Sequence, residues 1–251
     1  MQRSERLRMI IRIVDAGARS VGDLVELTGS SAITIRRDLM ELAEQGALRR
    51  VRGGAAPAVA RGSEYPFDLR QAESTETKRA LAQLAAAQIT AGDCVVIDSG
   101  TTALAVAHEL AGTGITAMAL SLRAAAALNR TPGNEVIVPG GTIGYDDLSF
   151  TGASVADAVT AMRFDTAIIG ACAADPENGL TVAQWNDAHM KRAILKASRR
   201  IILVATADKF TRTAAHRFGE LSDVDMIITT ADAPPAVLYE ARTQGIEVLL
   251  V

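Results

Sequence analysis

A run of small and hydroxyl-bearing residues follows a predicted strand in the first half of the chain. Residues 95–110 read VVIDSGTTALAVAHEL: a β-branched apolar run meets an acid, then a glycine among three hydroxyl side chains, then a helix-like stretch. Gly100 allows a ligand to approach the backbone closely, and the start of the following helix offers N–H groups and a partial positive charge. This pattern predicts a phosphate site formed by Asp98, Ser99, Gly100, Thr101 and Thr102.

Glycine turns and charged residues recur near the ends of later predicted strands. Because the carboxyl ends of parallel strands open on one edge of a sheet, we expect these residues to reach the same rim. A single glycine turn is equally typical of a tight strand–helix loop, so only the repetition favours a binding site. The additional candidates for this site are Gly140, Gly141, Gly152, Lys191, Asp208 and Lys209.

Several ligand classes and locations are disfavoured by the residue pattern. Neither GxGxxG nor GxxxxGK[ST] occurs at a strand–helix turn, which argues against dinucleotides and ATP, and we expect no cofactor. Cys94 and Cys172 lie far apart without metal-ligand spacing, so we expect two reduced thiols and no metal site. The apolar runs are too short to span a bilayer, and the N-terminal region has no signal-peptide core. We therefore expect a cytoplasmic protein without a membrane partner.

A second set of residues, near the N-terminus, has the types and spacing to read DNA. In SSAITIRRDLMELAEQG, residues 30–46, the spacing of Ile35, Leu39 and Leu42 predicts a helix with these side chains inward. The opposite face carries arginine, which can pair with guanine, and isoleucine, which can contact a thymine methyl. Hydroxyls at the helix start can hold a phosphate. The candidate DNA contacts on this helix are Ser31, Ile33, Thr34, Arg36 and Arg37.

The segment after this helix, ALRRVRGGAAPAV, is typical of a short β-hairpin with paired glycines at its turn. Its residues Arg49, Arg50 and Arg52 suit contacts to the DNA backbone or minor groove. Residues 1–60 hold ten arginines against seven acidic residues, whereas residues 61–251 hold sixteen basic and twenty-two acidic residues. A solvated surface of a small helical domain is the alternative. An outward isoleucine among arginines on a capped helix favours DNA.

Three helical patterns in quick succession position this DNA-reading face. The first has apolar residues at helical spacing from Leu7 to Val14. The second begins at Ser20, with Asp23 as its capping-box partner, and Gly29 supplies the turn before the third. A short helix, a glycine turn, a capped helix and a hairpin together predict a small winged helix-turn-helix domain.

From residue 77 onward, short apolar runs alternate with longer amphipathic stretches. Strands that are apolar almost throughout and separated by helices are typical of parallel strands buried on both faces, so we predict a larger, Rossmann-like α/β domain. The predicted strands span 94–98, 116–120, 135–138, 166–171, 200–206, 226–230 and 247–251. The expected domains are the winged helix at 1–57, an irregular linker at 58–76 and the α/β domain at 77–251.

Both predicted domains resemble the DeoR family of bacterial transcription regulators. The N-terminal resemblance rests on TIRRDL, residues 34–39, and on the arginine-rich hairpin ending in GGA. The C-terminal resemblance rests on DSGTT, PGG, SFTG, FDTAIIGA, GLT, MKRAIL and ADKF. It implies a sensor domain similar in fold to ribose-5-phosphate isomerases, with a phosphorylated sugar or polyol as effector at the residues named above. The ALSL run at 119–122 departs from the family's usual Thr-Asn-Ser, which leaves the effector's identity open.

A sugar-phosphate isomerase is the alternative function that this kinship raises. Isomerisation needs a carboxylate or an equivalent base to move a proton between carbons. The isomerases carry acids after the IIGA-type strand and before the lysine of the MK-type helix, where this chain has Cys172, Ala173 and Met190. The missing acids favour a binding protein, and we expect no catalytic residues.

We therefore expect a transcription regulator that represses a sugar or polyol catabolic operon. It would bind double-stranded operator DNA and leave it when a phosphorylated metabolite occupies the α/β domain. A single winged helix binds DNA modestly, so we expect a homo-oligomer, a dimer or tetramer that reads repeated half-sites.

Overall fold

The structure, a computed structural model, describes residues 3–15, 17–44, 47–57 and 66–251. The chain divides into two compact units, the head unit (Met1–Glu73) and the body unit (Ser74–Val251). Within the described residues, no helix combines the length and the apolar character that crossing a membrane requires.

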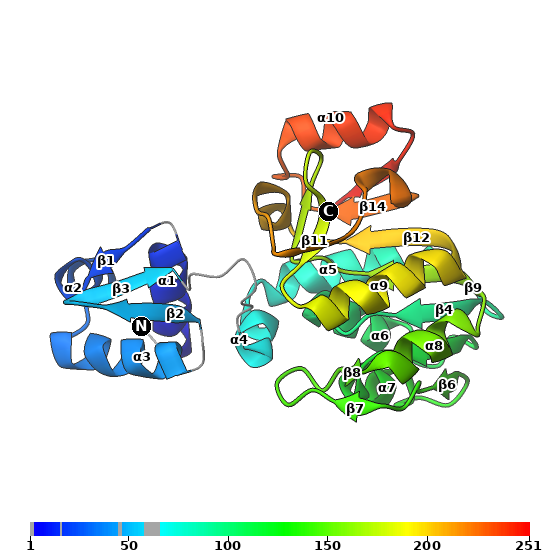
Figure 1. Cartoon of the computed structure of the whole chain (residues 1–251), viewed down its shortest axis with the longest axis horizontal. Helices are drawn as coiled ribbons and strands as arrows, with labels where there is room; N and C mark the ends of the chain where they lie inside the picture. Colours follow the sequence, from blue (N-terminus) through cyan, green and yellow to red (C-terminus); the bar gives the residue numbers. More distant parts are fainter. Residues whose placement is uncertain (1–2, 16, 45–46, 58–65) are drawn as a thin grey trace. The chain divides into compact units, whose positions relative to one another are not determined.

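The head unit contains a helix-turn-helix and a small antiparallel sheet, as predicted (Figure 1). Its elements are α1 (Arg3–Asp15), β1 (Arg19–Ser20), α2 (Val21–Thr28), α3 (Ala32–Glu44), β2 (Leu48–Val51), β3 (Gly54–Pro57) and α4 (Phe67–Ala72). Strand β3 lies between β1 and β2, and it pairs with β2 to form the hairpin, or wing. The alternation of residues 48–57 is thus explained by an antiparallel hairpin.

Side-chain caps and a glycine turn set the ends of the head helices. Ser20 and Asp23 form the predicted capping box at the start of α2: each backbone N–H donates to the other side chain, at 2.9 and 3.1 Å. Gly29 ends α2 at φ 66°, a left-handed conformation that favours glycine. The Ser31 hydroxyl caps α3 by accepting from the Thr34 N–H at 3.2 Å. These local signals explain why the sequence located both helices.

Apolar side chains from the helices and the wing form one core in the head unit. The three residues predicted to face inward on α3 are all buried in it, which confirms the helical register of that segment. On α2, Leu24 is buried, whereas Leu27 is exposed. The cluster comprises Leu7, Ile10, Ile11, Val14, Leu24, Ile35, Leu39, Leu42, Ala47, Leu48 and Ala55.

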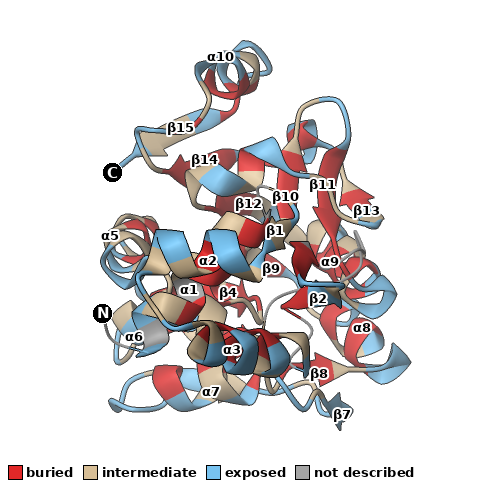
Figure 2. Ribbon diagram, turned by 90° about the vertical axis from the view of Figure 1, so that its left-hand side faces the viewer, coloured by how far each residue is buried: buried red, intermediate tan, exposed pale blue. Residues whose placement is uncertain are grey.

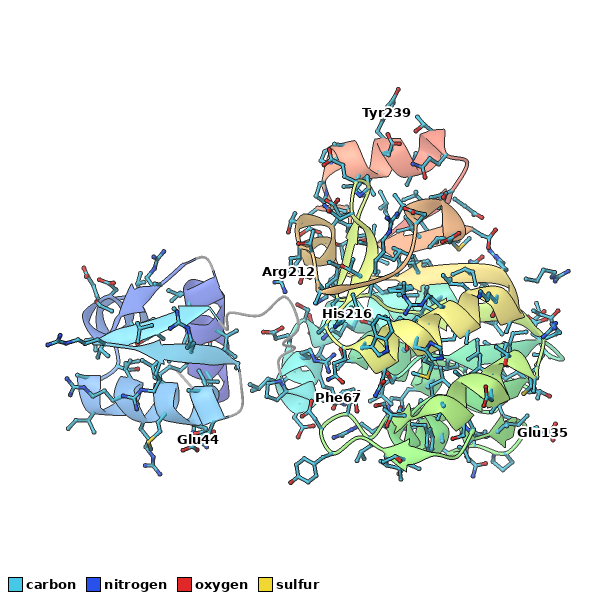
Figure 3. The ribbon with its side chains drawn as sticks, in the orientation of Figure 1. Glu44, Phe67, Glu135, Arg212, His216 and Tyr239 are labelled. Atoms are coloured by element: carbon cyan, nitrogen blue, oxygen red, sulfur yellow. The ribbon has the colours of Figure 1, made fainter. Side chains whose placement is uncertain are left out.

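The body unit contains seven parallel strands that coincide with the seven predicted apolar runs. They are β4 (Cys94–Ile97), β5 (Thr116–Ala119), β6 (Glu135–Ile137), β9 (Phe164–Ile169), β12 (Ser198–Val204), β14 (Met226–Thr229) and β15 (Glu247–Leu250). Their order in the sheet is β15-β14-β12-β9-β4-β5-β6, and every pairing is parallel. Glu135 marks the β6 edge of the sheet (Figure 3).

Helices cover both faces of this sheet. They are α5 (Thr75–Ala86), α6 (Thr101–Glu109), α7 (Leu122–Leu128), α8 (Ala153–Thr160), α9 (Trp185–Ala197) and α10 (Pro235–Thr243). Helices α5, α6 and α7 pack side by side, and α8 and α9 pack together on the opposite face (Figure 1). Burial follows this layering: the inner strands and the inward faces of the helices are buried, whereas the edge strands β6 and β15 and the outward helix faces are more exposed (Figure 2).

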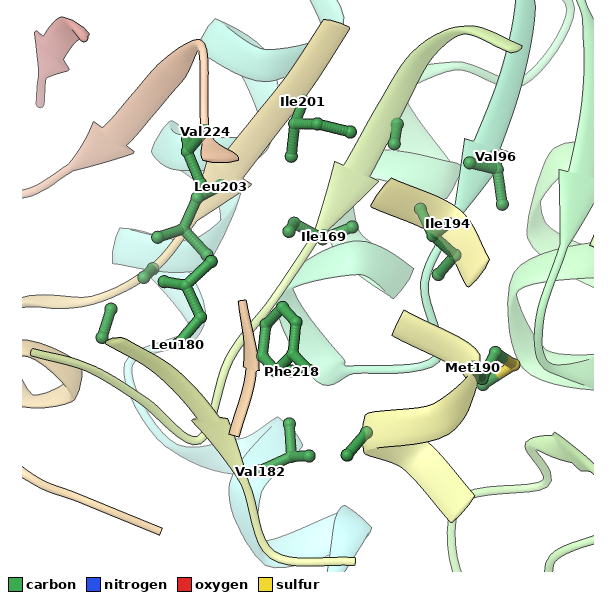
Figure 4. Close-up of a cluster of buried hydrophobic side chains, with 14 of the residues drawn as sticks. Val96, Ile169, Leu180, Val182, Met190, Ile194, Ile201, Leu203, Phe218 and Val224 are labelled. Carbon is green, nitrogen blue, oxygen red and sulfur yellow. The ribbon is translucent and has the colours of Figure 1, made fainter. Parts of the chain in front are cut away.

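A large core cluster of the body unit lies between the sheet and α9. It brings Ile169 of β9 and Leu203 of β12 together with Ile194 of α9 (Figure 4). Phe218 closes the same cluster from a strand outside the main sheet. This core fixes α9 on the central strands, and the position of α9 matters for the site described below.

Two small β elements lie in stretches that were predicted as loops. Strands β10 (Ala173–Asp175), β11 (Gly179–Val182) and β13 (His216–Gly219) form a separate antiparallel sheet. Strands β7 (Thr142–Ile143) and β8 (Phe150–Thr151) form a hairpin after the paired glycines. These strands contain residues such as Asp175 and Gly179, which interrupt an apolar run, and this is why the sequence did not indicate them.

The stretch predicted as an irregular linker contains regular structure instead. Helix α4 and the first residues of α5 fall within residues 58–76, and Phe67 of α4 is fully buried. Pro66, which suggested an irregular segment, stands at the N-cap of α4, and proline disrupts a helix interior but not its start. Residues 58–65, with the predicted wing residue Val59, lie outside the described residues.

A truncation at the centre of the sheet tests the assigned core. Ile168 lies on β9 between β12 and β4 and is fully buried. Ile168→Ala should lower the free energy of unfolding by about 2–5 kcal/mol, because it leaves a cavity where methyl groups were packed. Urea denaturation followed by circular dichroism measures the change. Tyr145→Ala is the control, because that side chain is fully exposed and its loss should cost less than about 0.5 kcal/mol. Equal losses in the two variants would contradict the assigned core.

Candidate functional site

The outward face of α3 presents the side chains predicted to read DNA. Ile33 is 78% exposed and Met40 is 48% exposed, although both are large apolar side chains. Arg36 and Arg37 are also exposed on this face. This exposed apolar and cationic helix face is suited to a DNA groove, where thymine methyls and guanine edges are the complementary groups.

The wing places three more arginines at the surface of the head unit. Arg49 and Arg50 are exposed on β2, and Arg52 is exposed in the turn between β2 and β3. At the start of α3, the hydroxyls of Ser31 and Thr34 are hydrogen-bonded to each other at 2.9 Å. The Ser31 hydroxyl, bonded to Thr34, therefore caps the N-terminus of α3.

A buried ion pair joins α3 to α1 on the side away from the exposed arginines. Arg6 Nε donates to Asp38 Oδ2 at 2.6 Å, and only 4% of the Asp38 side chain and 14% of the Arg6 side chain are exposed. A second pair, between Arg3 and Glu41, joins the same helices at the surface. Asp38 was not among the residues predicted for a site, although its spacing from Ile35 and Leu42 places it on the inward face.

In the body unit, the N-terminus of α6 lies at the carboxyl end of the central strand β4. Gly100 is its N-cap, in an extended conformation with φ −69° and ψ 164°, and no side chain caps this helix. The first N–H groups of a helix have no partner within it, so this end is available to an anion. By contrast, the neighbouring helix α7 is capped by Ser121, whose hydroxyl accepts from the Ala124 N–H at 3.1 Å. Of these two helix ends, α6 is the one without a side-chain cap.

Asp98 and Lys191 form a buried salt bridge directly beneath this loop. Asp98 is 1% exposed and Lys191 is 3% exposed. The Asp98 carboxylate also accepts from the backbone N–H groups of Ser99 and Gly170, each at 2.8 Å. Lys191 donates further to the Gly170 carbonyl at 3.0 Å. The pair therefore ties the end of β4, the end of β9 and α9 together.

The lysine of this pair is held in its charged form. Burial alone would lower the pKa of the Lys191 ammonium, but the nearby carboxylates of Asp187 and Asp98 outweigh burial and raise that pKa. Asp187 lies one helical turn before Lys191, with its Oδ1 atom 3.7 Å from the Lys191 Nζ atom. The centre of the Phe218 ring lies 5.6 Å from the same Nζ atom. Lys191 is thus fully engaged by the protein, and its charge is balanced.

The glycines predicted for the site lie around a second helix end. Gly140 and Gly141 both have positive φ values, 77° and 90°. A Cβ on Gly141 would come within 2.8 Å of the Thr151 carbonyl and 2.7 Å of a Val155 methyl, so only glycine fits there. Gly152 is the N-cap of α8, again without a side-chain cap. The structure therefore brings Gly141 against the start of α8.

The last predicted pair, Asp208 and Lys209, lies in a short 3-10 helix, η1 (Ala207–Thr211), which contacts β10. Partial burial opposes the charge of Asp208, but Lys209, the Thr206 hydroxyl and Arg212 outweigh it and lower the pKa of this carboxyl. Lys209 Nζ lies 3.5 Å from Asp208 and Arg212 lies 3.3 Å from it. Among the described residues, no hydrogen bond or ion pair joins this group to Asp98 or Lys191.

Other residues of the site were not predicted. Gly170 and Asp187 contact the buried pair, and Ser121 caps α7. Gly170 lies in the FDTAIIGA run and Ser121 in the ALSL run, but neither was assigned a role at the site. Trp185, the chain's single tryptophan, begins α9 and is 62% exposed, with the Arg192 guanidinium 5.3 Å above its ring and the His216 ring 5.8 Å away. In the described part of the chain, no group of three or more potential metal ligands gathers.

Two family models match the chain, one over each unit. A DeoR-like helix-turn-helix domain matches residues 6–58, and the DeoR C terminal sensor domain matches residues 73–231. The chain belongs to the DeoR family of transcriptional regulators. This confirms the resemblance seen in the sequence.

Individual relatives match along nearly the whole chain. The HTH-type transcriptional regulator GlpR of Haloferax volcanii is 33% identical over 98% of this chain and 97% of its own length. The glycerol-3-phosphate regulon repressor of Haemophilus influenzae is 36% identical over 100% of this chain and 98% of its own length. Among solved structures, ribose 5 phosphate isomerase A from Neisseria gonorrhoeae matches 54% of this chain and 53% of its own, with 18% identity and a TM-score of 0.37.

Membership in this family means that the chain is a regulator and not an enzyme, as predicted. Ala173 and Met190, predicted to stand in place of the acids of an isomerase, lie in the interior of the body unit. Ala173 is fully buried, and Met190 and Ile169 are buried within the core cluster. These positions therefore contribute to packing.

Removing the buried ammonium tests the role of the pair. Lys191→Met should lower the free energy of unfolding by about 3–5 kcal/mol, because it leaves the Asp98 carboxylate buried without a counter-charge. The variant should regain part of this loss as the pH falls, since an unpaired buried carboxylate has a raised folded-state pKa and protonation then favours the folded state. Urea denaturation at several pH values measures both effects.

Lys196→Met on the same helix is the control, because Lys196 is exposed and its loss should change stability by less than about 0.5 kcal/mol. If the two lysine variants lost the same stability, the pair would not hold the site together.

Proposed function

We propose that this regulator represses a sugar or polyol catabolic operon and leaves its operator when a phosphorylated sugar or polyol binds the body unit. Two relatives that match nearly the whole chain support this direction, since one is named a glycerol-3-phosphate regulon repressor and another a transcriptional repressor GlcR. The proposal places the chain in the cytoplasm, where both DNA and phosphorylated metabolites occur.

Operator binding rests on α3 and the wing. The exposed isoleucine and the two adjacent arginines of α3 enter the major groove and contact base edges, while the wing arginines contact phosphates or the minor groove. The proposed contacts are Ser31, Ile33, Thr34, Arg36, Arg37, Arg49, Arg50 and Arg52. One head unit offers a small contact area, so we propose a dimer or tetramer on repeated half-sites.

Effector binding rests on the uncapped N-terminus of α6, and this observation carries the proposal. The N–H groups after Gly100 and the hydroxyls of Ser99, Thr101 and Thr102 would hold the phosphate at the edge where open α/β sheets bind ligands. Gly140, Gly141 and Gly152 would line the neighbouring helix end, and Asp208 with Lys209 would approach the distal hydroxyls.

Asp98 and Lys191 take a positioning role in this proposal. Their charges already balance each other, so a phosphate would meet backbone N–H groups before it meets a free cation. The pair would hold the α6 loop and the Gly170 loop at a fixed separation. Release of DNA then requires that the effector bind more tightly to the chain off DNA than on it, because only differential affinity shifts an equilibrium.

Truncation of an exposed arginine tests the DNA face. Arg37→Ala should weaken operator binding by about 1–3 kcal/mol, because a bidentate contact to a base edge is lost. Gel-shift titration measures the affinity, on a duplex that the wild-type chain enriches from a random library. Glu44→Ala, an exposed change farther along α3, is the control and should not weaken binding. Unchanged affinity in Arg37→Ala would remove that arginine from the interface.

A carboxylate introduced at the N-terminus of α6, where it would compete with a bound phosphate, tests the effector site. Gly100→Asp fits the extended backbone, and a Cβ there meets no atom within 4 Å. The new carboxylate should cap α6, leaving stability within about 0.5 kcal/mol of wild type or slightly above it. Because it occupies the helix N-terminus, it should abolish the thermal stabilisation by phosphorylated ligands, which is about 2.7 kcal/mol at 100 times the dissociation constant.

The matched control is Gly100→Ala, which adds a Cβ without an acceptor and should keep the ligand response. The ligand panel is a set of sugar and polyol phosphates that includes glycerol 3-phosphate. If no compound stabilises the wild-type chain, the effector class is wrong. If Gly100→Asp responds like wild type, the site is wrong.

A further inference from the structure

The contact between α1 and α3 contains a buried ion pair within an otherwise apolar core. Arg6 and Asp38 meet through a 2.6 Å hydrogen bond from Nε to Oδ2, with a second, longer contact of 3.5 Å from the terminal nitrogen to Oδ1. Around them lie the apolar residues of the head core, including Ile10 and Ile35. Asp38 is the one acidic residue of α3 that is buried.

We propose that Arg6 and Asp38 are a positioning pair: they fix the rotation and axial placement of α3 and thereby determine operator specificity without contacting DNA. This inference rests on the proposed function, because it assumes that the outward face of α3 reads base edges.

A buried ion pair is not the arrangement that most increases the free energy of unfolding of a core. Removing two charged groups from water is costly, and well-packed apolar residues of similar volume often stabilise a core as well or better. What the pair adds is a directional constraint on how α3 is oriented against α1. Apolar contacts change little when a helix slides or rotates slightly, whereas a hydrogen bond between charged groups weakens steeply with misalignment.

The position of Asp38 in α3 makes this direction relevant to recognition. It directly follows Arg36 and Arg37, and successive residues of a helix are separated by about 100° of rotation. The helix backbone between them, two or three residues long, therefore fixes the outward guanidinium groups of Arg36 and Arg37 relative to the inward Asp38 carboxylate. Any rotation of α3 that the pair prevents would displace Ile33 and both arginines from the base edges, where hydrogen bonds are equally directional.

The chain offers a control that is matched in charge and in the helices it joins. Glu41 lies on α3 one turn after Asp38, and its partner Arg3 lies on α1 one turn before Arg6. The Arg3 side chain is 62% exposed, so this outer pair is solvated and should constrain the helix little. Asp38→Asn and Glu41→Gln each remove one negative charge from α3, so both change the attraction to DNA phosphates in the same way.

The experiment measures the affinity of each full-length variant for two duplexes, one enriched by the wild-type chain from a random library and one of scrambled sequence. Titrations are done at about 10 °C, near the usual temperature of maximum stability, after circular dichroism confirms folding. Asp38→Asn should lower the ratio of specific to scrambled affinity about tenfold, the effect of one mismatched base pair, and leave scrambled affinity unchanged or raised. Glu41→Gln should keep the ratio within about twofold of wild type.

The ratio separates positioning from mere stabilisation. Partial unfolding of the head unit would lower both affinities by the same factor and leave the ratio unchanged, and that result would overturn the proposal. An unchanged ratio in fully folded Asp38→Asn would overturn it too. If Asp38→Asn does not fold, Arg6→Lys keeps both charges but loses the Nε donor, and it must lower the ratio by about threefold or more for the proposal to stand.

Arg37→Ala distinguishes this proposal from the function on which it depends. If Arg37→Ala lowers the ratio and Asp38→Asn does not, α3 reads DNA but the pair does not position it. If neither changes the ratio, α3 does not read the operator.

Discussion

The parallel arrangement of the body sheet is the constraint on which the candidate effector site depends. Because all seven strands run the same way, their carboxyl ends open on one edge, and α6, which follows β4, begins there without a side-chain cap. Strand β4 lies between β9 and β5, so the α6 loop has a neighbouring strand end on either side. The salt bridge of Asp98 with Lys191 then joins two of these strand ends to α9. A site at this edge follows from the topology, and the residues at the edge decide what it can hold.

The sheet and the head helices were predictable because their signals are local. The inner parallel strands are buried and therefore read as short apolar runs. The head helices have caps at Ser20 and Ser31 and a glycine turn at Gly29. The antiparallel strands β10 and β11 were not predictable, since residues such as Asp175 and Gly179 carry no strand preference and become strands only through pairing. Helix α4 was missed because a proline before a helix looks the same as a proline in a loop.

The site was predictable in its membership but not in its contacts. Asp98 and Lys191 were both candidates, yet they are 93 residues apart in the chain, and no local pattern indicates that they bind each other. Their mutual pairing shifts the proposed anion contact from a lysine to backbone N–H groups. The same limit applies to Arg6 and Asp38, which are 32 residues apart. In the body unit, the Lys191 charge that looked available in the sequence is paired within the fold, and backbone N–H donors remain at the end of α6.

The exposed tryptophan at the start of α9 has a practical consequence. Trp185 is the chain's sole indole, and it begins the helix that carries Lys191. Its ring is largely exposed and lies near the Arg192 guanidinium and the His216 ring. Its fluorescence therefore originates from one known place, next to the helix that ties the sheet edge together. The intrinsic fluorescence of Trp185 therefore reports rearrangements of α9 without an added dye.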